Sequence, residues 1–214
     1  MSCPSGHQGS SSGTNNQRLE NLVVERPIGK TIDNNYTHLV LSSGHTPRSP
    51  GAISPCGLRE HDLNWETLKA IVRELKEANS TLVVTVLPRL WDLRRKIKWL
   101  EDYPRGDSST LFLEIHHTAF NTKAQGTECF SRHGDLRAFR VGSGIVNTLS
   151  RDLGLRNRGM KLGSQSARGS LGWLKRDGAL LLEVFFMDNP MDRELGDLQK
   201  VGNIIAQSLI KWAP

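Results

Sequence analysis

Residues 111–117 read LFLEIHH, and this stretch decides the fold. Its period of two places Glu114 and His116 on one face of a predicted strand and Ile115 on the other. Three more apolar runs predict strands, at residues 38–41, 81–87 and 179–186. We interpret residues 81–87, which are apolar and β-branched almost throughout, as a central strand covered on both faces.

Helical patterns separate these strands. The first helix is predicted to begin at Asn64 as its N-cap and to end near Asn79, and the second to run from about residue 135 to residue 153, with Gly154 as its stop. A closing helix is predicted after Asn189, with an inner face of Leu195, Leu198, Ile205 and Leu209. Strands that alternate with helices predict a single α/β domain, with a mostly parallel or mixed central sheet and helices on both faces.

The length of 214 residues is enough for one domain with a substantial core. Residues 1–18 are nearly all small and polar, so we predict a disordered tail there. Residues 19–34 are interpreted as an extension of uncertain structure, and residues 35–214 as the domain that carries the chemistry.

The chain is basic, with 28 Lys and Arg residues against 22 Asp and Glu residues and a formal charge of +6. Such a surface favours anionic partners, among which nucleic acid, anionic lipid and anionic cell-wall polymers qualify. The densest basic stretch is residues 89–99, which we interpret as an amphipathic surface helix with a solvated basic face rather than a polyanion site. That face would comprise Arg89, Arg94, Arg95, Lys96 and Lys98.

The three cysteines, Cys3, Cys56 and Cys129, have no CxxC spacing, so neither a disulfide framework nor a thiolate zinc site is predicted. No apolar run approaches the roughly 18 residues that a membrane span needs, and the N-terminus lacks the pattern of a secretory signal. We therefore expect no integral membrane association and a cytoplasmic location until the protein is released.

Polar residues follow or interrupt the predicted strands at His45, His116 and Glu183, and the carboxyl ends of strands in open α/β sheets converge on one site. With Glu60, the two histidines form the ligand set of a catalytic zinc, which keeps one position open for water. Glu183 interrupts an apolar run, and a carboxylate in such a place implies a nearby cation or a functional pKa. Each residue alone is more often structural, so the prediction depends on their convergence.

Four motifs occur in order along the chain. The first consists of Gly44-His45, Pro50-Gly51-Ala52 and Gly57-Leu58-Arg59-Glu60. The second is Ile115-His116-His117-Thr118-Ala119-Phe120-Asn121, followed by Ala124-Gln125-Gly126-Thr127-Glu128. The third is Arg158-Gly159-Met160-Lys161, and the fourth runs from Leu181 through Glu183 to Asn189-Pro190. Together they resemble the zinc-dependent N-acetylmuramoyl-L-alanine amidases of the amidase-3 type, including phage endolysins.

The resemblance implies that residues 35–214 are a catalytic amidase domain with peptidoglycan, and not nucleic acid, as its partner. It implies that His45, Glu60 and His116 hold one Zn²⁺ ion and that Glu183 is the catalytic acid and base. The reaction would cut the amide bond between N-acetylmuramic acid and L-alanine of the stem peptide. A phage endolysin that lyses its host is the leading interpretation, and a bacterial lysin released by mother-cell lysis is the alternative.

Some residues near the motifs keep two interpretations. Glu114 replaces the small residue usual in the family, and it is either an acceptor for an imidazole N–H or a structural or solvent-paired group. Glu128 braces the loop of the site or binds substrate, and Asn121 is a further substrate candidate. His117 is predicted to lie in the core or on the surface rather than to bind metal. Surface positions are predicted for His7, His61 and His133.

Two other functions remain open on the sequence. A zinc carboxypeptidase acting on wall peptides would need a pocket for a free carboxylate, most simply an Arg facing the metal. A non-catalytic wall-binding protein would have lost a ligand or the acid/base carboxylate, and all four of these residues are present. The peptidoglycan chemotype, the host, the role of the tail and the oligomeric state are left open.

Overall fold

The computed structural model describes residues 36–104 and 107–213. The predictions for residues 1–18 and 19–34 lie outside this range. The described chain forms a six-stranded sheet with the order β2-β1-β3-β6-β4-β5. The strands are β1 (His38–Ser43), β2 (Val83–Val86), β3 (Thr110–Thr118), β4 (Thr127–Ser131), β5 (Asn157–Leu162) and β6 (Ala179–Phe186).

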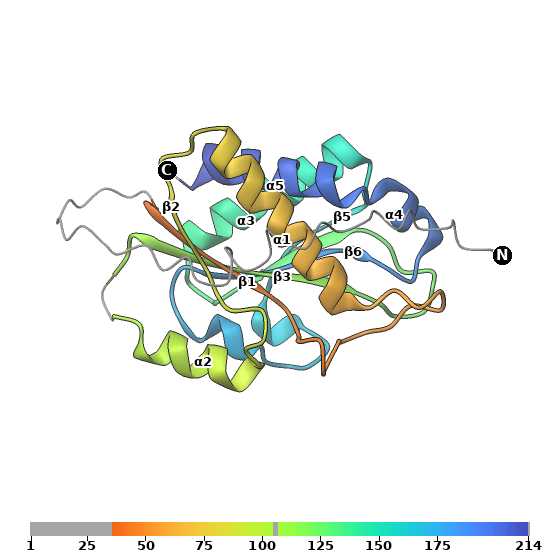
Figure 1. Ribbon diagram of the computed structural model, residues 1–214, viewed down its shortest axis with the longest axis horizontal. Helices are drawn as coiled ribbons and strands as arrows, with labels where there is room; N and C mark the ends of the chain where they lie inside the picture. Colours follow the sequence, from red (N-terminus) through yellow and green to blue (C-terminus); the bar gives the residue numbers. More distant parts are fainter. Residues whose placement is uncertain (1–35, 105–106, 214) are drawn as a thin grey trace, which may run out of the picture.

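The sheet is mixed, as predicted. Strands β2, β1, β3 and β6 run parallel, whereas β4 pairs antiparallel with β6 and parallel with β5. Helices α1 (Glu60–Glu77), α3 (Leu136–Leu153) and α5 (Leu198–Trp212) lie together on one side of the sheet in Figure 1, and α2 (Leu93–Asp102) lies on the other. The two sides correspond to two separate hydrophobic clusters.

The alternation of β3 and β6 sorts their side chains between these clusters. Leu113 and Ile115 belong to the larger cluster beneath α1, α3 and α5, while Phe112 belongs to the smaller cluster on the α2 side. On β6, Leu182 and Leu181 divide in the same way. Since alternate residues share a face, Glu114, His116 and Glu183 all lie on the α2 side.

Helix α3 forms as its termini predict. Asp135 is its N-cap and accepts a hydrogen bond from the Ala138 amide, and Gly154 at the other end has a left-handed φ of 77°. The inner face of α3 buries Val141, Ile145 and other apolar residues against β4 and β5.

Three predicted elements differ in the structure. The first helix begins at Glu60 after the N-cap Arg59, so Asn64 is a buried helical residue and not the cap. Strand β2 is half-buried at the edge of the sheet and is not a central strand, because no other strand of the described chain pairs beyond it. The closing helix is broken at Gly196 into α4 (Pro190–Leu195), which Asn189 does cap, and α5.

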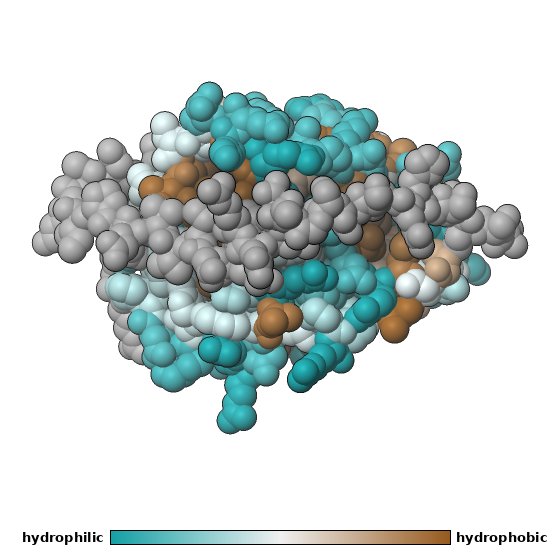
Figure 2. Space-filling view, in the orientation of Figure 1, coloured by the Kyte–Doolittle hydropathy of each residue, from teal (hydrophilic) through white to brown (hydrophobic). Residues whose placement is uncertain are grey.

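The basic stretch forms α2, whose N-cap Asp92 accepts a hydrogen bond from the Arg95 amide. Arg94, Arg95 and Lys98 are exposed. The lower part of the molecule in Figure 2, which is the side of α2 in Figure 1, is largely hydrophilic. Arg89 precedes the helix and is half-buried, whereas Lys96 within it is buried at 2% exposure and contacts the sheet. The prediction of a solvated face is therefore wrong for Lys96.

Candidate metal centre

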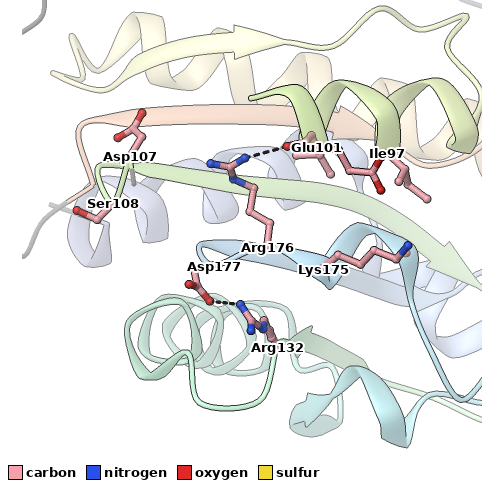
Figure 3. Close-up of a pocket in the computed structure, with 10 residues that line it drawn as sticks. Ile97, Glu101, Asp107, Ser108, Arg132, Lys175, Arg176 and Asp177 are labelled. Carbon is pink, nitrogen blue, oxygen red and sulfur yellow. Dashed lines mark hydrogen bonds and ion pairs between the residues drawn. The ribbon is translucent and has the colours of Figure 1, made fainter. Parts of the chain in front are cut away.

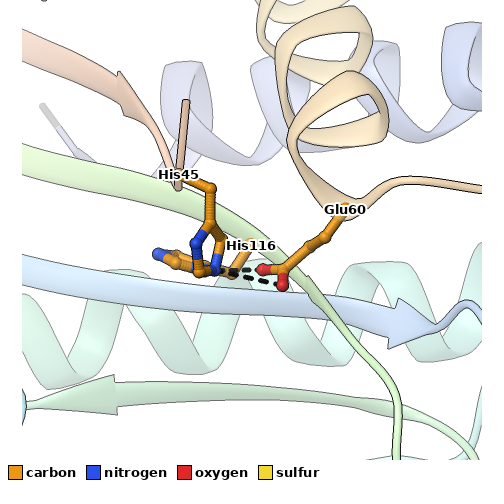
Figure 4. Close-up of side chains that lie close together, drawn as sticks. All are labelled: His45, Glu60 and His116. Atoms are coloured by element: carbon orange, nitrogen blue, oxygen red, sulfur yellow. Dashed lines mark hydrogen bonds and ion pairs between the residues drawn. The ribbon is translucent and has the colours of Figure 1, made fainter. Parts of the chain in front are cut away.

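Three segments bring His45, Glu60 and His116 together. His45 follows β1, Glu60 is the first residue of α1, and His116 lies near the carboxyl end of β3. One possible ligand atom from each lies within 4.8 Å of the others. His45 Nε2 is 3.1 Å from Glu60 Oε2, and His116 Nδ1 is 2.8 Å from Glu60 Oε1 (Figure 4).

Two glycines of the first motif leave the space that these side chains occupy. A Cβ atom on Gly44 would lie 2.3 Å from Cε1 of His116. A Cβ atom on Gly51 would lie 2.4 Å from Oε2 of Glu60, and Gly51 also has a φ of +75°, which side-chain-bearing residues rarely adopt. The backbone is thus shaped around the three candidate ligands.

The backbone that leads into His45 is fixed by residues of α1. His45 itself has a left-handed φ of 64°. The preceding carbonyl, of Gly44, accepts a hydrogen bond from Asn64 Nδ2 at 3.2 Å and contacts His61 Nδ1 at 3.3 Å. Arg89 Nε donates to His61 Nε2 at 3.0 Å, so His61 Nδ1 is the nitrogen that donates to Gly44.

His61 is therefore fully buried, and its predicted surface position is wrong. Burial, together with the charge of Arg89, lowers the pKa of His61 below its usual value, which keeps the ring neutral. In the sequence, His61 stands between a glutamate and an aspartate, which is typical of an exposed position. Its contact with a backbone carbonyl 17 positions earlier could not be predicted from these neighbours. His133 is exposed as predicted, and His7 lies outside the described residues.

Glu183 lies beside His116 in the parallel pairing of β3 and β6. Its Oε2 atom is buried and has no hydrogen-bond partner among the described residues. Burial raises the pKa of Glu183 to about 7, and the nearby carboxylates of Glu60 and Glu128 act in the same direction. A carboxyl group with such a pKa can both accept and donate a proton near neutral pH.

Glu114 faces the second ring nitrogen of His116, with its Oε2 atom 3.3 Å from His116 Nε2. Burial acts to lower the pKa of His116, but the hydrogen bonds and charges of Glu114 and Glu60 outweigh it and raise that pKa to about 10. The two nitrogens of this ring thus face different carboxylates, and only Nδ1 faces the ligand cluster.

Glu128 is paired directly with Glu183 across β4 and β6. Its Oε2 atom accepts hydrogen bonds from Arg158 Nε at 2.6 Å and Lys161 Nζ at 2.5 Å, which joins the second and third motifs. Both cations compensate the negative charge that Glu128 places beside Glu183.

Asn121 and His117 lie outside the ligand cluster. Asn121 is exposed, and its Oδ1 atom accepts hydrogen bonds from the amides of Lys123 and Ala124 in a turn. His117 lies in the core, which is one of the two positions predicted for it. Its Nδ1 atom is 2.8 Å from Oδ1 of Asn64. Burial lowers the pKa of His117 to about 3, so this ring is also neutral.

A cleft of about 840 Å³ opens over the site. The three candidate ligands line it together with Glu183, and so do the exposed cations Arg94 and Arg168.

A second pocket, of about 500 Å³, is lined by charged residues that include Asp107, Arg176 and Asp177 (Figure 3). It lies at the amino ends of β3 and β6, because Asp107 precedes β3 and Asp177 precedes β6.

The fold and the site define an α/β enzyme with a candidate metal centre at the carboxyl ends of parallel strands. A family model described as N-acetylmuramoyl-L-alanine amidase matches residues 39–211, and the chain belongs to this family. Its members hydrolyse an amide bond of peptidoglycan, which gives the chain its enzyme class. No curated protein matches the chain.

Solved structures of amidases share the fold. Cwp6 from Clostridium difficile superimposes with a TM-score of 0.69 at 22% identity over 85% of this chain, which corresponds to only 30% of Cwp6. The catalytic domain of CwlV, an N-acetylmuramoyl-L-alanine amidase from Bacillus (Paenibacillus) polymyxa var. colistinus, gives 0.65 at 21% identity over 81% of this chain and 94% of the other. The catalytic domain of the CD27L endolysin, described as targeting Clostridia difficile, gives 0.61 at 18% identity, with 84% and 99% covered.

Proposed function

We propose that the chain is a zinc-dependent peptidoglycan hydrolase that cleaves the amide bond between N-acetylmuramic acid and L-alanine of the stem peptide. The observation that carries the proposal is the position of Glu183. Its buried Oε2 atom, which has no partner among the described residues, lies next to a cluster of two imidazoles and one carboxylate. Family membership supports the substrate class.

The residues present fit a zinc ion. His45 Nε2, His116 Nδ1 and one oxygen of Glu60 would hold it, and nitrogen and carboxylate oxygen are donors that zinc accepts. Gly44 and Gly51 keep the surrounding space free of Cβ atoms. When bound at such a three-ligand site, zinc supplies Lewis acidity and lowers the pKa of water to about 7.

The chain's own residues supply the proton transfers. Glu183, with a pKa raised to about 7 by burial, takes the proton from the attacking water and passes it to the nitrogen of the leaving L-alanine. Arg158 and Lys161 hold one oxygen of Glu128 beside it. The cleft around these groups offers room for a segment of glycan and stem peptide.

Purified protein and intact peptidoglycan test the proposal. Bound metal is quantified by elemental analysis, and released products are identified by mass spectrometry, before and after removal of metal with a chelator and after re-addition of zinc. We expect stem peptides that begin with L-alanine, no such product after chelation, and recovery with zinc. A wild-type preparation that binds no zinc, or that releases no such peptide, would refute it.

The same products separate the amidase from a carboxypeptidase. Arg94 and Arg168 line the cleft, and a carboxypeptidase would need an arginine to bind the free carboxylate of its substrate. Release of single C-terminal amino acids instead of whole stem peptides would favour that second function.

We further propose that the protein is an endolysin that accumulates in the cytoplasm of the producing cell and reaches the wall after release. Membership of the amidase family and the likeness in fold to the catalytic domain of the CD27L endolysin support this role. Within the described residues, no helix is both long and apolar enough to cross a membrane.

Expression in a bacterium with susceptible peptidoglycan tests the role. The culture should remain intact until its membrane is permeabilised and should then lyse, whereas lysis or secretion without permeabilisation would contradict it.

A further inference from the structure

We propose that Lys96 is a positioning residue of the metal centre, which acts through Glu114 on the imidazole of His116. The inference depends on the proposed function in one respect, that His116 is taken as a metal ligand. Lys96 belongs to α2, which contributes none of the candidate ligands, so this helix would have a part in the site that the motifs do not indicate.

A continuous chain of contacts connects Lys96 to His116. Lys96 Nζ is 3.2 Å from Glu114 Oε1, and Ser42 Oγ donates to the same oxygen at 3.1 Å. The other oxygen of Glu114 lies 3.3 Å from His116 Nε2. The opposite nitrogen of that ring, Nδ1, lies 2.8 Å from Glu60 within the ligand cluster.

Lys96 also reaches the segment that carries another candidate ligand. Its Nζ donates a hydrogen bond to the carbonyl of Ser43, the last residue of β1. His45 follows two residues later. One ammonium group therefore contacts both the end of β1 and the side chain that faces His116 from β3.

The burial of this ion pair points to a role other than stability. The side chains of Lys96 and Glu114 are only 2% and 3% exposed, whereas Arg94, Arg95 and Lys98 on the same helix are exposed. Removing two charges from water costs free energy that their attraction does not always recover, so a buried pair of this kind contributes little net stability. Its retention beneath a ligand is explained if it orients that ligand.

Two effects on the ligand set follow from the geometry. With Oε1 held by Lys96 and Ser42, Glu114 presents Oε2 to His116 and would be kept from turning toward a bound ion as an additional carboxylate ligand. The imidazole would then direct its Nε2–H to Glu114 and its Nδ1 lone pair to the metal. Such outer hydrogen bonds fix the tautomer and the orientation of a ligating histidine.

The test measures metal binding rather than hydrolysis. Full-length Lys96→Met, Glu114→Gln and the double variant are compared with wild type for zinc affinity by chelator competition and for the absorption spectrum after substitution with Co²⁺. Lys98→Met is the matched control, since Lys98 is an exposed lysine of the same helix that pairs with Asp102. The spectrum reports ligand identity and geometry, which a loss of stability alone does not change.

We expect Lys96→Met to weaken zinc binding by roughly 10–100-fold, the effect typical of outer-ligand partners, and to alter the Co²⁺ spectrum. The double variant should bind zinc no more weakly than Lys96→Met, because both changes act through the same ring. Lys96→Met leaves the buried carboxylate of Glu114 without its cation and is destabilised for that reason. The double variant removes this carboxylate as well, so it should fold even if Lys96→Met does not. Lys98→Met should match wild type.

Wild-type zinc affinity and an unaltered Co²⁺ spectrum in both Lys96→Met and the double variant would overturn the inference. If the wild-type protein remains an active amidase in that case, the proposed function stands. If the wild-type protein binds zinc but releases no stem peptide, the proposed function fails while the positioning role can still be confirmed. A wild-type protein without zinc affinity would overturn both.

Discussion

The two ends of β3 and β6 each carry a charged pocket, and they differ in how the charges are satisfied. At the amino end, Arg132 pairs with Asp177 at 2.7 Å. Arg176 donates to the carbonyls of Leu100, Tyr103 and Pro104 at the end of α2. At the carboxyl end, Glu183 retains a buried oxygen without a partner among the described residues.

This difference separates charges that other residues satisfy from a carboxylate oxygen that the described residues leave unpaired. Arg176 occupies carbonyls at the end of α2 that have no partner within the helix, which is a structural use of a cation. Glu183 is instead close to three residues whose side chains suit a metal, and its Oε2 atom has no hydrogen-bond partner in the described part of the chain. Charge alone therefore does not identify a functional pocket, and unsatisfied charge is the better guide.

The largest expected effect is that of Glu183→Gln. Loss of the group that moves the proton should lower kcat by roughly 10²–10⁴-fold, the usual contribution of general acid–base catalysis, with zinc content unchanged. Turnover of peptidoglycan and elemental analysis measure both. Full activity in this variant would show that the unsatisfied carboxylate has no role in the reaction.

A pair of glycine variants tests whether the backbone around the cluster is specifically shaped. Gly51→Ala and Gly57→Ala both place a side chain at a left-handed φ. The new Cβ atom at position 51 would contact Glu60 and His45, whereas the new Cβ atom at position 57 would have no neighbouring atom within 4 Å. Both should lose stability by about 1–2 kcal/mol. Only Gly51→Ala should also bind zinc more weakly, by roughly 10–100-fold, a loss like that of an outer ligand partner. Equal zinc affinities would contradict the prediction.

Zinc binding should strengthen with rising pH. Glu114 and Glu60 raise the pKa of His116 to about 10 in the metal-free protein, despite burial, so the ring is protonated near neutral pH and must lose a proton to bind metal. Affinity should rise about tenfold per pH unit for each proton released, between about pH 6 and pH 8. Titration calorimetry in buffers of different ionisation enthalpy counts those protons, and a count of zero would contradict the assignment.

The smallest effect is expected at the amino end of the strands. Asp177→Asn removes the partner of Arg132, but the two side chains are 82% and 50% exposed. Exposed pairs contribute about 0–1 kcal/mol, so the free energy of unfolding should fall by less than about 1 kcal/mol, with activity unchanged. Chemical denaturation and a turnover assay are sufficient, and a large loss of activity would mean that the two ends of the sheet are coupled.

The sequence predicts the elements whose signals are local. Residues 179–186 form β6 with the predicted bounds, and α3 spans Leu136–Leu153, close to the predicted range of about 135 to 153, and ends at the predicted stop Gly154. Strand β3 extends the predicted run by one residue at each end. An apolar run, a cap and a glycine depend on few distant contacts, which is why these elements could be predicted.

Elements set by distant pairing could not be predicted. Strand β4 is only five residues long, and β5 has largely polar residues, so neither has a clear pattern of its own. Strand β2 has the composition of a central strand but lies at the edge, because position in a sheet depends on which other strands pair with it.

The candidate site divides in the same way. The motifs predict the ligand set because His45 and Glu60 belong to one motif, and because His116 and Glu183 lie on strands that the sequence predicts. The residues that support the ligands could not be found from the sequence. In the sequence, Lys96 is indistinguishable from the exposed lysine at position 98. Its burial depends on its contact with Glu114 of β3.

The candidate ligands also link the folding of distant segments. Glu60 and His116 are 56 residues apart in the chain, and His45 lies on a third segment. An ion held by all three would act as a reversible cross-link between β3, α1 and the loop after β1. It would stabilise the folded state by about 4 kcal/mol at a thousandfold excess over Kd. The melting temperature would then report metal occupancy, and metal-depleted surroundings would expose the protein to proteolysis before it could act.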